Sequence, residues 1–214
     1  MHCFAHRLQL ALVAASKEVH EVWLFFSKLS IIVNFASSSF KRHSELKSIR
    51  KDEIIDLLAS GELQSGRGAN QICTLQRAGA TRWSSHFASV SSLIEMFSSI
   101  FVLLEKMIDN GLNSNICGEA KGAYKEMKSF EFVFILHLMN KVLGIPDMLC
   151  QALQMKSQDI LTALYLVSTT KILLQKLRED GWNTFLKDVE LFCERYDLLY
   201  FFLTFSNFLE KNNI

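Results

Sequence analysis

The chain has 214 residues, of which 50% are hydrophobic and 21% are charged, with 17 Phe, 9 Gly and 1 Pro. This composition excludes intrinsic disorder, collagen-like repeats and low-complexity classes, and the scarcity of Gly and Pro favours helices. The net charge of +1 predicts no strong global field. Residues 1–94 nevertheless hold 11 basic against 7 acidic side chains, and residues 95–214 hold 12 against 15, so any anion-binding surface should lie in the first part.

The first third of the chain predicts two helices separated by a serine-rich break. Residues 7–36 favour one long amphipathic helix, because apolar side chains recur at steps of three and four. They are Leu8, Leu12, Ala15, Val19, Val22, Phe26, Leu29 and Val33. The serines at 37–39 mark the break, and residues 41–60 favour a second helix with Gly61 suited to its C-terminal cap. Its inward residues are Leu46, Ile49, Ile54, Leu57 and Leu58.

The middle of the chain predicts a loop followed by further helices. Residues 61–80 hold 4 of the 9 glycines, and long loops in compact domains are usually functional or disordered. Residues 84–110 favour one continuous helix, which Asn110 and Gly111 end. Its apolar stripe consists of Phe87, Val90, Ile94, Phe97, Phe101, Leu104 and Ile108. Residues 116–141 predict one or two more helices.

Three last helices complete the predicted all-α chain. Residues 146–156 favour a short helix, because the single proline that opens this segment suits a first turn. Ser157 and Asn183 suit the N-caps of helices over residues 158–179 and 184–210. No alternating pattern indicates a strand, so we expect a helical bundle.

The N-terminus carries a weak signal-peptide pattern. An apolar run over residues 8–15 follows His2, His6 and Arg7, as in secretory leaders. Gln9 interrupts this run, and the helical pattern continues past any cleavage site, so secretion is a less favoured alternative. No uncharged apolar stretch of about 18 residues is present, and we therefore expect no membrane span.

The five cysteines predict reduced thiols rather than a disulfide framework. Their number is odd, their spacing is wide and no CxxC motif occurs, which is typical of a cytosolic or nuclear protein. Cys3 and His6 form a CxxH motif, but a structural zinc site needs four ligands and no second pair follows at finger spacing. We expect no bound metal, and the alternative role of this pair is at a helix start.

Two segments could contact nucleic acid. Arg82 and Trp83 follow the Gly-rich loop at a helix start, where Trp can stack on a base while Arg neutralises a phosphate. On residue types alone the favoured alternative is a Trp that anchors the loop to the core. The second segment is the basic run from Lys41 and Arg42 to Lys51, whose alternative is an ordinary solvated helix face.

Catalytic patterns are missing from the sequence. The acidic groups Asp52, Glu53 and Asp56, and the pair Glu179 and Asp180, lie beside basic residues and favour solvated helix ends. Two-metal catalysis needs carboxylates that converge from separated elements. No phosphate-binding glycine loop or nucleophile elbow occurs.

Two ordered blocks resemble DNA transposases of the hAT superfamily, nearest to the branch of TTF-type zinc-finger and zinc finger MYM-type protein 1-like proteins. Residues 2–14 resemble the block in which a CxxH motif, here Cys3 and His6, opens a helix of the RNase H-like catalytic core. Residues 81–85 resemble a second block, whose Arg and Trp act near the DNA end that is cut.

This resemblance implies a domain division. Residues 1–38 would be a helix remnant of the RNase H-like core, and residues 39–214 would be the all-α insertion domain. The family's first two catalytic Asp lie upstream of the CxxH block, and its Glu lies after the insertion domain. We therefore expect no enzymatic activity and no cofactor in this fragment, although the parent family uses Mg or Mn.

The expected function is that of a catalytically incomplete hAT-type transposase fragment. It would retain weak DNA-end binding through Lys41, Arg42, Arg82 and Trp83, in the nucleus, or in the cytoplasm if import signals are missing. One alternative is a helical protein-interaction or assembly module that self-associates through the apolar segment 200–208. Another is a decayed gene product with no molecular function.

Overall fold

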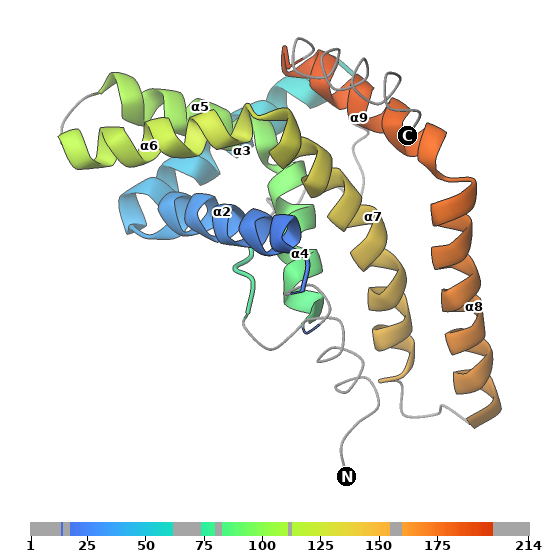
Figure 1. Cartoon of the computed structure of the whole chain (residues 1–214). Coiled ribbons are helices and arrows are strands. Elements are labelled where there is room, and N and C mark those ends of the chain that lie inside the picture. The colour runs from blue at the N-terminus through green and yellow to red at the C-terminus, as the bar shows by residue number, and fades with distance from the viewer. Residues whose placement is uncertain are drawn as a thin grey trace. The chain divides into compact units, whose positions relative to one another are not determined.

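The computed structural model describes residue 14 and residues 18–61, 74–79, 83–110, 113–154 and 160–198, without the side chains of Trp83, Ser84 and Ile160. Every regular element in these ranges is a helix, which confirms the all-α prediction for the described part (Figure 1). The helices are α2 (His20–Ser37), α3 (Phe40–Ala59), α4 (Trp83–Glu95), α5 (Phe97–Asp109), α6 (Ser114–Met127), α7 (Phe130–Ala152), α8 (Ile160–Glu179) and α9 (Trp182–Arg195).

The chain divides into two compact units that interleave along the sequence. The central unit consists of residues 26–78 and 88–126, and within it α3 packs against α5. The C-terminal unit consists of residues 1–25, 79–87 and 127–214. In it α7 contacts both α8 and α9, and α7 and α8 lie antiparallel and side by side (Figure 1). The predicted division after residue 38 stays a prediction.

The ends of α3 follow from local sequence, as predicted. The Oγ atom of Ser39 accepts a hydrogen bond from the backbone N–H of Arg42 at 3.2 Å, which satisfies one of the unpaired donors of the first turn. At the other end Gly61 has φ +77°, a left-handed conformation that favours glycine. Along the helix, Leu46, Ile49 and Ile54 are buried.

The continuous helix expected over residues 84–110 is wrong, because the chain bends by 72° between α4 and α5. The bend lies at Met96, which has φ −101° and ψ 13° and only 1% of its surface exposed. Apolar residues of α5 occupy a wide arc that includes Ile100, Leu103 and Leu104, all at 0% exposure. The apolar periodicity continues through the bend, so it carries no signal for the break.

The expectation that a new helix opens at Pro146 is also wrong. Pro146 lies inside the 23-residue helix α7 and is buried. A proline in a helix interior removes one backbone hydrogen bond and usually costs stability. One turn region of α7 near this proline is closely packed, because a Cβ added to Gly144 would lie 3.3 Å from the ring of Phe87.

The length and composition of helix α7 do not fit the expectation that the chain has no segment able to span a membrane. Among the described helices, it is the one long and apolar enough to cross a membrane by length and composition alone, with a mean hydropathy of 1.4 over its best window. The pairs α2 with α3 and α4 with α5 meet the same criterion only when each bent pair is taken as one span. In the fold, 44% of the α7 window is buried, and the helix contacts α8 and α9.

Helix α9 begins earlier and ends earlier than predicted. Gly181, rather than Asn183, is its N-cap, and the helix ends at Arg195 instead of residue 210. At its end Asp197 adopts φ 54°, and the N–H of Leu198 donates to the carbonyl of Cys193 at 2.8 Å. This is a Schellman cap, and it seats Leu198 at 1% exposure. An Asp in the left-handed position is tolerated, so the sequence gives little warning of this stop.

Candidate nucleic-acid interface

The predicted binding residues divide between the two units. Lys41 and Arg42 lie in the first turn of α3, in the central unit. Trp83 opens α4 and belongs to the C-terminal unit, and Arg82, Cys3 and His6 lie outside the described residues. That these residues form one site stays a prediction from the sequence.

The helix start expected at the Arg–Trp block is present. Helix α4 begins at Trp83, and the N–H of Gly79 donates to Oγ of Ser85 at 2.8 Å. This bond ties the preceding segment to the first turn of the helix. The side chain of Trp83 lies outside the described atoms, so its role stays a prediction from the sequence.

The side chain of Arg42 is held in place by contacts with Phe35 and Ser39. Its guanidinium carbon lies 4.4 Å from the ring centroid of Phe35, within cation–π distance. Its Nε donates to Oγ of Ser39 at 3.3 Å, beside the backbone bond to the same oxygen. Its Nη1 is buried and has no hydrogen-bond partner in the described part of the chain. Arg42 thus fixes the start of α3, and Lys41 is the exposed member of the predicted pair.

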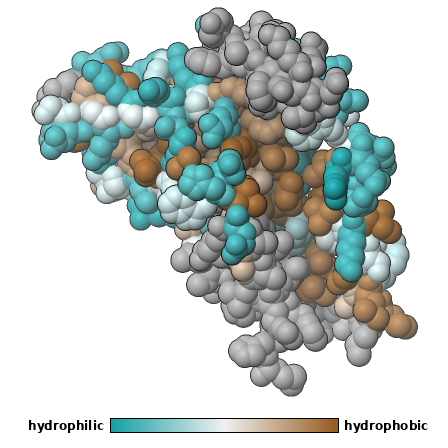
Figure 2. All heavy atoms as spheres, viewed as in Figure 1, coloured by the Kyte–Doolittle hydropathy of each residue, from teal (hydrophilic) through white to brown (hydrophobic). Residues whose placement is uncertain are grey.

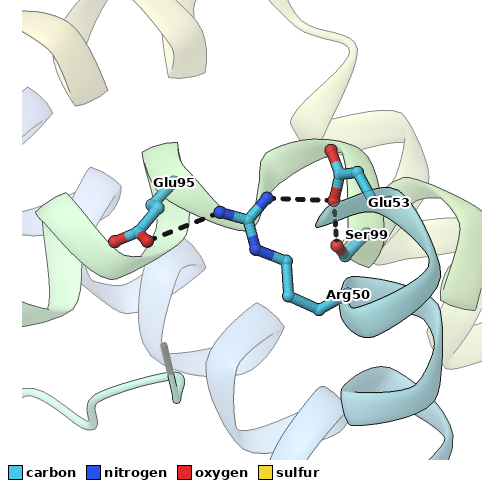
Figure 3. Close-up of polar contacts among 4 residues, drawn as sticks. All are labelled: Arg50, Glu53, Glu95 and Ser99. Atoms are coloured by element: carbon cyan, nitrogen blue, oxygen red, sulfur yellow. Dashed lines mark hydrogen bonds and ion pairs between the residues drawn. The ribbon is translucent and has the colours of Figure 1, made fainter. Parts of the chain in front are cut away.

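Arg50 is neutralised by two glutamates (Figure 3). Its Nη1 donates to Oε2 of Glu53 at 3.0 Å, and its Nη2 lies 3.4 Å from Oε1 of Glu95. Oε2 of Glu53 also accepts the hydroxyl of Ser99 at 2.5 Å, which joins α3 to α5. The Arg50 side chain is only 12% exposed. The interpretation of Glu53 as a solvated helix end is therefore wrong.

Three lysines of α3 remain available to solvent. Lys41, Lys47 and Lys51 are exposed, and none of them takes part in an ion pair among the described residues. They lie on the outward side of the helix, away from the buried Leu46 and Ile49. Lys41 and Lys51 are separated by about 15 Å along the helix axis, at about 1.5 Å per residue. We call the exposed residues Phe40, Lys41, Ser44, Lys47, Ser48 and Lys51 the α3 lysine face.

Two hollows border this face, and Lys41 lines both. The first, of about 520 Å³, is open and is lined by Phe40, Lys41, Ser44, Glu45 and Ser48. The second, of about 280 Å³, lies between the start of α3 and the chain around the end of α5 and the start of α6. Its far wall consists of Met107, Asn110, Asn113 and Ile116. The first hollow is thus a shallow depression on α3 itself, and the second is the more enclosed of the two.

A third hollow has the opposite charge character. It has a volume of about 510 Å³, lies between α3 and α5, and is lined by Asp52, Glu53, Asp56 and Lys106 among others. No group of three or more His, Cys, Asp or Glu converges as metal ligands in the part of the chain that the structure describes. Lys106 and the pairing of Glu53 with Arg50 offset part of the negative charge.

Burial shifts the pKa values of side chains described in the C-terminal unit. Burial is the main influence on His137 and lowers its pKa to about 4. The charge of Asp188 raises this pKa and the charge of Lys141 lowers it, both by smaller amounts. Burial and the charge of Glu190 raise the pKa of Cys193 to about 11, so its thiol stays protonated at neutral pH. Cys117, Cys150 and Cys193 form no disulfide bond, as the sequence predicts for these three described cysteines.

Comparison with known proteins assigns no family to the chain. No model of a known protein family matches the chain, and no solved structure resembles it. The resemblance to hAT transposases therefore rests on its two sequence blocks.

The sequence analysis does not single out Phe40 of the α3 lysine face, which is 89% exposed, and it does not reveal that Arg50 of the same helix is paired. The position of Phe40 could have been found from the helical period, since residues 40, 44, 47 and 51 share one side of α3, opposite the buried Leu46. The pairing of Arg50 depends on Glu95, 45 residues away, and no local pattern contains that information.

Proposed function

We propose that this chain is a helical, catalytically incomplete part of a hAT-type DNA transposase, which binds DNA phosphates through the α3 lysine face and does not cut strands by itself. The observation that carries the proposal is the set of three exposed lysines without ion-pair partners among the described residues. They lie in the half of the sequence that has the basic excess. A nuclear location is part of this proposal, because DNA is the ligand.

The mechanism of binding is electrostatic. Each lysine that neutralises a phosphate releases condensed counterions, so the affinity falls steeply with salt. The hydroxyls of Ser44 and Ser48 lie on the same exposed side and can donate to phosphate oxygens. Arg42 and Arg50 act indirectly by holding α3 in place through Ser39, Phe35 and the two glutamates.

Strand cleavage is left out of the proposal for a chemical reason. Cleavage in the parent family needs three carboxylates around divalent metal ions. The resemblance places those carboxylates outside both matched blocks, and the described residues hold no convergent ligand group. We expect no cleavage of a labelled duplex in Mg²⁺ or Mn²⁺, and cleavage that a chelator abolishes would contradict this part of the proposal.

A mobility-shift assay on duplex DNA tests the binding site. The variant Lys41→Ala/Lys47→Ala/Lys51→Ala removes the exposed charges of the face. The matched control removes three exposed lysines elsewhere, Lys121, Lys125 and Lys187. We expect the first variant to lose most of the shift and the control to keep it, and equal losses in both variants would mean that net charge alone drives binding.

A second candidate function, assembly, is favoured by helix α8. Its apolar side chains are unusually exposed, with Leu161 at 79%, Tyr165 at 70%, Ile172 at 66% and Leu164 at 61%. They share one stripe, and Figure 2 shows apolar surface over the first half of this helix. A stripe of this kind marks an interaction site. The apolar segment 200–208, through which the sequence predicts self-association, lies outside the described residues.

The partner proposed for this stripe is a second copy of the chain. Antiparallel pairing centred on Ser168 places Leu164 opposite Ile172, and Tyr165 lies opposite the aliphatic stem of Lys171. Parallel pairing would bring like charges together. Light scattering should show a dimer that Leu164→Lys dissociates, while Ile31→Lys, at an exposed apolar residue of α2, leaves it intact. A monomer at high concentration would contradict this candidate.

A further inference from the structure

Phe40 is an exposed aromatic residue at the edge of the α3 lysine face. It is the first residue of α3, directly after the N-cap Ser39, and 89% of its surface is exposed. An isolated exposed apolar residue needs no explanation by itself. Phe40, however, also lines the open hollow of about 520 Å³ together with Lys41, the two serines and Glu45.

The positions along α3 place Phe40 in line with two lysines. Residues 40, 44, 47 and 51 follow one another at steps of four, three and four, so at about 100° per residue they stay within one narrow sector of the helix. The order along this sector is aromatic, hydroxyl, ammonium, ammonium. The ring therefore lies at one end of a row of groups that can contact phosphates.

The chemistry of this row fits unpaired nucleotides. An aromatic side chain stacks on the face of any base, and each such contact is worth about 1–3 kcal/mol. In a duplex the base faces are covered by neighbouring pairs, so Phe40 gains nothing there, whereas the lysines contact either form. On the basis of the proposed DNA-binding function, we propose that the α3 lysine face binds single-stranded nucleic acid, with Phe40 stacked on a base and Lys47 and Lys51 on the phosphates that follow.

Other occupants fit this face less well. A protein helix or a lipid surface needs several large apolar anchors. Phe40 is the only large apolar side chain among the six residues of the face, and the other five are lysine or serine. The next exposed apolar residue of this sector, Ile55, lies about 22 Å from Phe40 along the helix axis, at about 1.5 Å per residue, so the two form no continuous apolar patch. Anionic vesicles therefore serve as the competing ligand in the test.

Fluorescence anisotropy with the full chain, a labelled single strand and its duplex tests the inference. Phe40→Ala should weaken single-strand binding about 5- to 150-fold, which is the stacking energy expressed as an affinity ratio, and change duplex binding less than about 2-fold. Phe40→Trp should restore single-strand affinity. Ile31→Ala, at another exposed apolar residue, should change neither. Since Phe40 is exposed, thermal unfolding should be unchanged by its substitution.

The possible outcomes separate this inference from the proposed function. Duplex binding that depends on the three lysines, with no effect of Phe40→Ala on the single strand, overturns the stacking inference and leaves the DNA-binding proposal standing. Loss of binding to both forms in Phe40→Ala also overturns it. Binding of neither form by the wild-type chain removes both proposals. A Phe40-dependent binding of anionic vesicles without oligonucleotide binding assigns the face to membranes and contradicts both.

Discussion

Nη2 of Arg50 lies 3.4 Å from Oε1 of Glu95, although 45 residues separate the two in the sequence. Through this contact, and through the Glu53–Ser99 bond, the inner side of α3 is joined to the chain on either side of the Met96 bend. The lysines on the outer side of α3 are consequently presented from a helix that is fixed from within. The α3 lysine face thus lies on the outer side of α3, and the ion pairs of Arg50 with Glu53 and Glu95 lie on its inner side.

We predict that Arg50→Ala destabilises the protein by about 1–3 kcal/mol. The change leaves Glu53 and Glu95 without their cation, and Glu53 is partly buried. Urea unfolding measures the effect. The control Lys51→Ala, one residue along and exposed, should change the free energy of unfolding by less than about 0.5 kcal/mol. Equal effects of the two substitutions would show that the network adds nothing to stability.

Gly181 should not tolerate a side chain. A Cβ at this position would lie 2.7 Å from the carbonyl oxygen of Leu177, closer than such atoms approach, in the short connection between α8 and α9. We expect Gly181→Ala to cost about 1–3 kcal/mol. Gly118→Ala and Gly122→Ala in α6 meet open space, and each should stabilise by about 0.4–1 kcal/mol. Thermal unfolding of the three variants gives the comparison, and a neutral Gly181→Ala would contradict the packing described.

His137 should make the protein acid-sensitive. Its pKa is about 4 in the folded state, below the ordinary value of 6.5, so the unfolded state binds the proton first. Stability should therefore fall as the pH drops from about 6.5 to about 4, by about 3 kcal/mol at most, and His137 should add no further loss below that. The ring contacts Phe192 at 4.4 Å between centroids, so His137→Leu keeps an apolar contact.

The test of His137 is a comparison of pH profiles. The urea midpoint of the wild type should fall relative to that of His137→Leu as the pH drops through this window, because only the wild type has to protonate a buried imidazole. The ion pair between Lys141 and Asp188 is present in both proteins. Parallel profiles would mean that His137 is not buried as a neutral group. His20→Ala, at an exposed histidine, serves as the control.

The left-handed residue at the end of α9 gives a further prediction. Asp197 has φ 54°, where a residue with a Cβ is strained relative to glycine. Asp197→Gly should stabilise the protein by about 1 kcal/mol, and Asp197→Val should destabilise it. If both substitutions lowered the thermal midpoint, the Schellman cap that seats Leu198 would be in doubt.

The sequence was sufficient for the helices whose ends are marked by local chemistry. Ser39 and Gly61 lie at helix ends as expected, and α8 ends at Glu179 as predicted, because caps depend on residues within one turn. The bend at Met96 and the continuation through Pro146 could not be predicted, because both depend on packing against residues distant in the sequence. The apolar period is the same on both sides of each position.

In the candidate site too, features that depend on local sequence could be predicted, and contacts between helices could not. The exposure of Lys41 could be predicted from the charge pattern, whereas the contacts of Arg42 and Arg50 could not, because Phe35 and Glu95 come from other helices. Phe40 broke the polar pattern of its face, and such a break is the signal that sequence reasoning can use.

The salt dependence of duplex binding tests the central claim most directly. If Lys41, Lys47 and Lys51 each neutralise a phosphate, replacing all three with Ala should reduce the slope of log affinity against log salt by about 2.7, at about 0.9 per contact. The control that removes Lys121, Lys125 and Lys187 should keep the wild-type slope. A wild-type slope near zero, or an unchanged slope in the Lys41→Ala/Lys47→Ala/Lys51→Ala variant, would contradict the assignment of DNA binding to the α3 lysine face.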